Sequence, residues 1–126
     1  MPRVFVIERT KSTMDLSTAA AYGELVVVFD RDHRRTSVFN TVAYGEAIRE
    51  RLDELGFDPA TDYICIVGSM VTTTVFAMAT LVAYKCVNFL FFDAMHSSYI
   101  DRVISVDDWS TGDIDARQDN TVQHHS

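Results

Sequence analysis

The chain has 126 residues, a formal net charge of −7 and 48% hydrophobic residues. This length suits a single domain, because a chain of this size can bury roughly two-thirds of its unfolded surface in one core. The acidic balance argues against general nucleic-acid binding, which relies on Lys and Arg to neutralise phosphates.

The first residues lead directly into an apolar strand rather than a signal peptide, so we expect a cytoplasmic protein. The uncharged run 64–84 has the length of a membrane span, but Gly68 and Ser69 break it at a strand–helix junction. We therefore expect no membrane association. Cys65 and Cys86 lie in apolar strand patterns and are predicted to be packed thiols, not a disulfide.

In chain order, continuous apolar runs at residues 4–8, 24–29, 63–67 and 87–92 predict four strands buried on both faces. The unbroken run at 24–29 predicts a central position in the sheet. Residues 98–105 alternate between apolar and polar, which predicts a fifth strand that returns antiparallel at an edge.

Three helices are predicted between these strands, at residues 16–22, 38–55 and 70–84. Gly23 ends the first, and Gly56 with Pro59 ends the second. The alternating order predicts a small Rossmann-like three-layer α/β sandwich with about five mostly parallel strands and right-handed crossovers. Residues 1–106 form the predicted domain, and residues 107–126 form an acidic tail that we expect to be mobile.

The predicted helix 70–84 has no charged residue, and its polar residues are threonines spread around its circumference. A helix that covers one face of a sheet normally keeps a polar side toward water. We therefore predict that this helix is covered on both sides, by the sheet on one and by a second subunit on the other, which makes the protein a homo-oligomer. Alternatively, the tail or the first helix shields it within one chain.

A candidate anion site follows from the predicted topology, because ligands of open α/β sheets bind outside the carboxyl ends of the strands. Cationic residues follow the first two strands, and the Gly68–Ser69 corner opens a helix whose first N–H groups suit a phosphate or carboxylate. The predicted ligands are Lys11, Arg31, Arg34, Arg35, Gly68, Ser69, Thr72 and Thr73. The simpler interpretation is a helix cap beside a solvated loop.

Asp30 and Asp32 offer an enzymatic alternative, because an Asp-x-Asp pair after a strand looks superficially like that of haloacid dehalogenase-like phosphatases. Together with Glu8 the two aspartates resemble the acidic trio of a topoisomerase–primase domain, although the spacing from the glutamate is too short. The glycine and threonine expected after the pair are replaced by Arg34 and Arg35. These aspartates are more simply interpreted as turn and cap residues. His33, His96 and the pair at 124–125 are interpreted as solvent-facing.

Three segments resemble a group of short uncharacterised proteins encoded by tailed bacteriophages. They are residues 15–26 (DLSTAAAYGELV), residues 62–68 (DYICIVG) and residues 87–92 (VNFLFF) with a later Ser-Tyr-Ile at 98–100. The resemblance covers about residues 3–104. It implies a viral or mobile-element origin, expression in a bacterial host cytoplasm and a role in host interaction, without an assigned activity.

Three functional hypotheses follow. The first is a non-enzymatic phage accessory protein that acts by binding, as a homo-oligomer or with a host protein. The second is a binder of nucleotides or other phosphorylated small molecules that sequesters a host signal. The third is a metal-dependent phosphohydrolase or nuclease that uses Asp30 and Asp32. We expect no cofactor.

Overall fold

A mixed five-stranded sheet in the order β2-β1-β3-β4-β5 organises the computed structural model, which describes residues 2–8, 16–29 and 39–109. The strands are β1 (Arg3–Glu8), β2 (Glu24–Phe29), β3 (Tyr63–Ile66), β4 (Cys86–Asp93) and β5 (Ser98–Ser105). The helices are α1 (Thr41–Leu55) and α2 (Met70–Tyr84), with short 3-10 segments η1 (Ala19–Tyr22) and η2 (Val106–Trp109). β1 to β4 are parallel, and β5 is antiparallel to β4.

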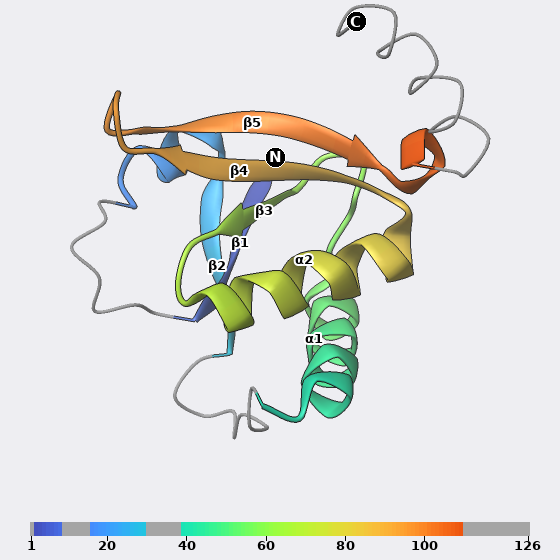
Figure 1. Cartoon of the computed structure of the whole chain (residues 1–126). Helices are drawn as coiled ribbons and strands as arrows, with labels where there is room; N and C mark the ends of the chain where they lie inside the picture. The colour runs from blue at the N-terminus through green and yellow to red at the C-terminus, as the bar shows by residue number, and fades with distance from the viewer. Residues whose placement is uncertain (1, 9–15, 30–38, 110–126) are drawn as a thin grey trace, which may run out of the picture.

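The sheet separates two hydrophobic clusters. Helices α1 and α2 lie side by side over one face (Figure 1), where Phe5, Ile64 and Phe89 from the strands meet Ile48 and Phe76 from the helices. On the other face, η1 and the residues just before it cover Val4, Val6 and Cys65. This arrangement confirms the three-layer α/β prediction, with η1 as a thin second outer layer.

A side-chain cap marks the start of both helices, and a glycine marks the end of α1. The Asn40 side chain accepts the Ala43 N–H at the start of α1, and the Ser69 side chain accepts the Thr72 N–H at the start of α2. Gly56 ends α1 with a φ of 73°, a left-handed conformation that glycine adopts without a Cβ penalty.

Two helix predictions need correction. The second helix starts at Thr41, not at residue 38, because Asn40 caps it. Residues 16–22 form a turn followed by the 3-10 segment η1 rather than an α-helix. The chain there is too short for α-helical hydrogen bonds to offset their nucleation cost.

The prediction that residues 24–29 form a central strand is wrong. β2 lies at an end of the sheet, hydrogen-bonded among the described strands to β1 alone. Its apolar run reflects cover on both faces, since Val28 packs in one cluster and Leu25 and Val27 pack against the other. Side-chain periodicity reports which faces are buried, but not whether the backbone has a neighbour on each side.

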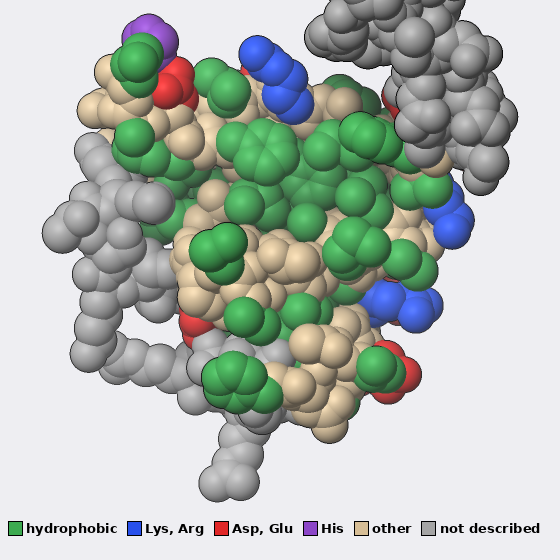
Figure 2. Space-filling view, in the orientation of Figure 1, with side chains coloured by type: hydrophobic (Ala, Val, Ile, Leu, Met, Phe, Trp, Pro, Cys, Tyr) green, Lys and Arg blue, Asp and Glu red, His purple; other side chains and the backbone are tan. Residues whose placement is uncertain are grey.

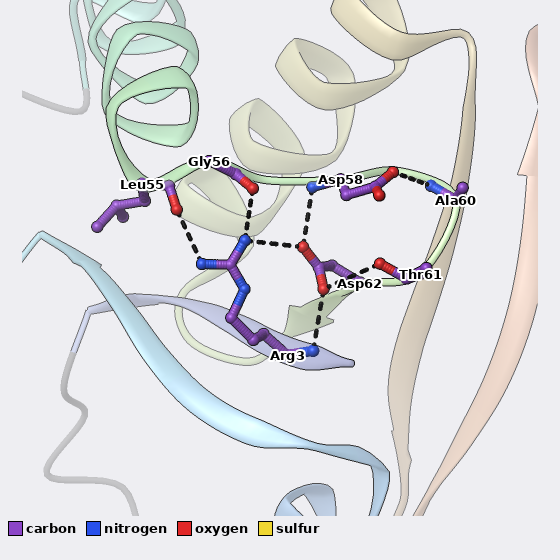
Figure 3. Close-up of polar contacts among 7 residues, drawn as sticks. All are labelled: Arg3, Leu55, Gly56, Asp58, Ala60, Thr61 and Asp62. Atoms are coloured by element: carbon purple, nitrogen blue, oxygen red, sulfur yellow. Dashed lines mark hydrogen bonds and ion pairs between the residues drawn. The ribbon is translucent and has the colours of Figure 1, made fainter. Parts of the chain in front are cut away.

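A partly buried ion pair joins the amino ends of β1 and β3 to the end of α1 (Figure 3). Asp62, 1% exposed, accepts hydrogen bonds from the Arg3 backbone N–H at 3.0 Å, the Arg3 guanidinium at 3.1 Å and the Asp58 N–H at 2.8 Å. The same guanidinium donates to the Leu55 and Gly56 carbonyl oxygens, which are left unpaired by the end of the helix. Arg3 and Asp62 therefore have a structural role.

Candidate functional site

The carboxyl ends of β1, β2, β3 and β4 meet at one edge of the sheet. Glu8 is in register with Phe29, Val6 with Cys65, and Ile66 with Phe91, all in parallel pairs. The topology required by the predicted anion site is therefore present. Lys11, Arg31, Arg34 and Arg35 lie outside the described residues, so the site itself stays a prediction.

The Gly68–Ser69 corner leads from β3 into α2 at this edge. Gly68 has a φ of 128°, a conformation that L side chains rarely adopt, so the tight turn requires glycine. Ser69 Oγ accepts the Thr72 N–H at 3.3 Å and donates to Thr72 Oγ1 at 2.8 Å. Thr73 Oγ1 donates to the Ser69 carbonyl oxygen at 2.9 Å. These predicted ligand hydroxyls are therefore already hydrogen-bonded within the first turn of α2.

His96 lies in the turn between β4 and β5, where its Nδ1 is in hydrogen-bond contact with Asp93 Oδ2. This contact is the main reason that the pKa of Asp93 is below its usual range. Asp93 also accepts the Met95 N–H, which makes the group a turn motif. The side chain of His96 is 71% exposed, which agrees with its interpretation as a solvent-facing residue. Asp30, Asp32 and His33 lie outside the described residues.

Helix α2 buries two of its four threonines and leaves several large apolar side chains exposed on its outer side. Thr72 and Thr80 are buried with Phe76, and Thr80 Oγ1 donates to the Phe76 carbonyl oxygen at 3.0 Å. On the outer side Met78 and Val82 are each 56% exposed. A helix that packs only against a sheet normally shows the reverse polarity. The outward side chains are therefore arranged as if they contacted another apolar surface.

We call Val71, Val75, Met78 and Val82 the outer stripe of α2. A groove of about 570 Å³ runs along it and is completed by residues of α1, among them Val42 (72% exposed) and Gly45. At Gly45 the two helices are in van der Waals range, since a Cβ added there would lie 3.8 Å from the Ala79 Cβ. Figure 2 shows hydrophobic side chains spread across this side of the molecule.

A second apolar hollow adjoins the outer stripe at the C-terminal end of α2. It has a volume of about 400 Å³, and its walls include Met78 and Val82 together with Val106 and Trp109 of η2. The Val106 N–H donates to the Lys85 carbonyl oxygen at 2.7 Å, which fixes η2 beside the helix end. Trp109 is 63% exposed.

Sequence reasoning missed part of this surface. Residues 107–109 were assigned to the mobile tail, whereas the structure places them in η2. The sequence did not indicate that Val42 belongs to this surface either, because Val42 lies beside the polar residues of α1. The one signal that identified the surface was the absence of charge in α2. No three His, Cys, Asp or Glu side chains of the described ranges are grouped to hold a metal ion.

These features define a small α/β protein with a mixed five-stranded sheet and an exposed apolar helical face. The profile of the Phage Pam3 gp32-like protein family matches residues 2–106. The chain therefore belongs to that family, which confirms the predicted relation to bacteriophage proteins of uncharacterised function. Neither a curated protein nor a solved structure shows significant similarity to it. None of the described helices is long and apolar enough to cross a membrane.

Proposed function

We propose that this phage protein is a non-enzymatic accessory protein that acts by binding in the host cytoplasm, as a homo-oligomer. The orientation of α2 carries the proposal: its outer stripe is apolar and includes the exposed Val71, Met78 and Val82, while Thr72 and Thr80 are buried. Full burial of a Val or Met side chain contributes roughly 1.5–3 kcal/mol. Several such side chains along one helix therefore favour association with a complementary apolar surface.

The polar features of the described chain support binding over catalysis. Asp62 is fully engaged with Arg3 and Asp58, and the hydroxyls at the start of α2 serve its cap. The internal contacts do not account for the exposed apolar side chains Val71, Met78 and Val82 of the outer stripe. A second copy of the chain supplies the matching apolar surface.

Static light scattering tests this proposal. We expect a particle larger than the 14.2 kDa chain, and Met78→Glu should shift it toward the single-chain mass because burial of an unpaired carboxylate is costly. Val103→Glu is the matched control. Val103 is 63% exposed and belongs to β5, where its register with Asn88 places it on the face opposite the helices. A 14.2 kDa wild-type particle would contradict the proposal.

A second candidate function is the binding of a nucleotide or another phosphorylated small molecule at the carboxyl edge. The parallel register supports it, since that edge receives the ends of β2, β1 and β3 together with the start of α2. The proposed ligands are Lys11, Arg31, Arg34 and Arg35 around the Gly68–Ser69 corner.

Thermal unfolding with a panel of nucleotides tests the second candidate. A ligand at a hundred times its Kd adds about 2.7 kcal/mol of stability, so a real site raises the melting temperature. Arg34→Ala with Arg35→Ala should remove the shift. Magnesium-dependent phosphate release that is lost in Asp30→Asn would instead support the phosphohydrolase hypothesis.

A further inference from the structure

The outer stripe of α2 has symmetric spacing. Its residues Val71, Val75, Met78 and Val82 are separated by four, three and four positions. This is the seam spacing by which one helix packs against another. Residue 82 lies eleven positions, or about three turns, after residue 71, so the stripe stays on one side of the helix. The pattern reads the same from either end.

We infer that two copies of the chain pair through α2 in antiparallel orientation about a two-fold axis, an inference that rests on the proposed function. The axis would pass between Val75 and Met78, at the midpoint of the stripe. In such an isologous contact each residue pair occurs twice. Val71 of one copy meets Val82 of the other, and Val75 meets Met78.

The segments of the chain outside the described residues do not have the composition to cover this stripe. Residues 9–15 (RTKSTMD), 30–38 (DRDHRRTSV) and 110–126 (STGDIDARQDNTVQHHS) are polar and charged. Their large apolar residues are Met14, Val38, Ile114 and Val122. An intramolecular cover would replace water mainly with polar groups. A second copy instead offers its own apolar stripe, in which Val71, Met78 and Val82 are exposed and Val75 is partly buried.

Charge also favours a second copy at this position. The chain has a net charge of −7, so most contacts between copies bring acidic groups together. The outer stripe avoids this because α2 has no charged residue. At the rim of the groove α1 contributes Glu46 and Arg49. Each copy therefore brings both signs of charge to the border of the contact, which suits self-association.

Crosslinking of engineered cysteines tests the pairing. In a Cys86→Ser background, which removes the exposed native thiol, we compare Val71→Cys, Val82→Cys and the double variant after treatment with a short bismaleimide. Within one chain residues 71 and 82 are about 16 Å apart along the helix, beyond the reach of the reagent. Antiparallel pairing predicts crosslinked dimer in the double variant and its loss in both single variants.

The outcomes separate the two proposals. Crosslinked dimer in either single variant would indicate parallel pairing and overturn the inference. An oligomer by light scattering without crosslinks in the double variant would also overturn it, while the proposed function would stand. A wild-type particle of 14.2 kDa would overturn both. Val103→Cys in the same background, exposed on β5 and facing away from the helices, is the negative control.

Discussion

At the residue scale, the buried polar side chains of the described chain are Asp62, Thr72 and Thr80, and each is hydrogen-bonded. Asp62 has the most partners, because it binds Arg3 twice and also binds the Asp58 N–H. A buried carboxylate in such a position costs little only while its partners remain. The contact thus determines how the end of α1 joins the sheet.

Asp62→Asn should lower the free energy of unfolding by about 2–4 kcal/mol. The new amide NH₂ would face an N–H group of Arg3 or Asp58, and that N–H would lose its acceptor. Urea denaturation measures the change. Asp58→Asn is the control, since Asp58 is exposed and an amide oxygen can still accept the Ala60 N–H. Equal midpoints for the two variants would show that the Asp62 contacts contribute little.

The two cysteines should differ in reactivity with thiol reagents at neutral pH. Burial raises the pKa of Cys65 to about 12, whereas Cys86 is exposed. Because the thiolate is the reactive form, we expect one label per native chain, at Cys86, and a second label only after unfolding. Mass spectrometry of labelled peptides measures this. Rapid native labelling of Cys65 would show that the β3 core opens readily.

At the element scale, the start of α2 depends on Ser69. Ser69→Ala should lower the free energy of unfolding by about 1 kcal/mol, because it removes the acceptor of the Thr72 N–H. Ser69→Asn should restore most of the loss, since asparagine is an equally good N-cap. Chemical denaturation of the three proteins measures both effects. A loss in Ser69→Asn as large as in Ser69→Ala would indicate a role of the hydroxyl beyond capping.

At the element scale, too, the sequence predicts those features of the strands and helices that leave a pattern in the order of apolar and polar side chains. The apolar runs predicted β1 to β4, and the alternation in residues 98–105 predicted the antiparallel edge strand β5. The position of β2 was wrong because backbone neighbours leave no mark on side-chain periodicity. Helix α1 starts three residues later than predicted because Asn40 caps it, and apolar periodicity does not mark the position of a cap.

At the scale of the whole molecule, the sequence predicted where chain segments meet better than what they bind. The predicted parallel order placed the carboxyl ends of the first four strands at one edge of the sheet. The parallel pairing of β1 to β4 has them there. The cationic residues expected there lie outside the described residues. The helical surface was predicted only through the uncharged α2. Trp109 joins this surface because the chain turns after β5. The apolar pattern of the sequence does not predict that turn.

The end of the folded unit gives a last prediction. Ending the chain after residue 109 should leave the free energy of unfolding nearly unchanged, because residues 110–126 contain few apolar groups. Ending it after residue 105 should lower that free energy by about 1 kcal/mol, because the hydrogen bond from Val106 to Lys85 and the contacts of half-exposed Trp109 are lost. Urea denaturation of both chains measures this. A large loss in the longer chain would place part of the core beyond residue 109, whereas equal stability of both would make η2 dispensable.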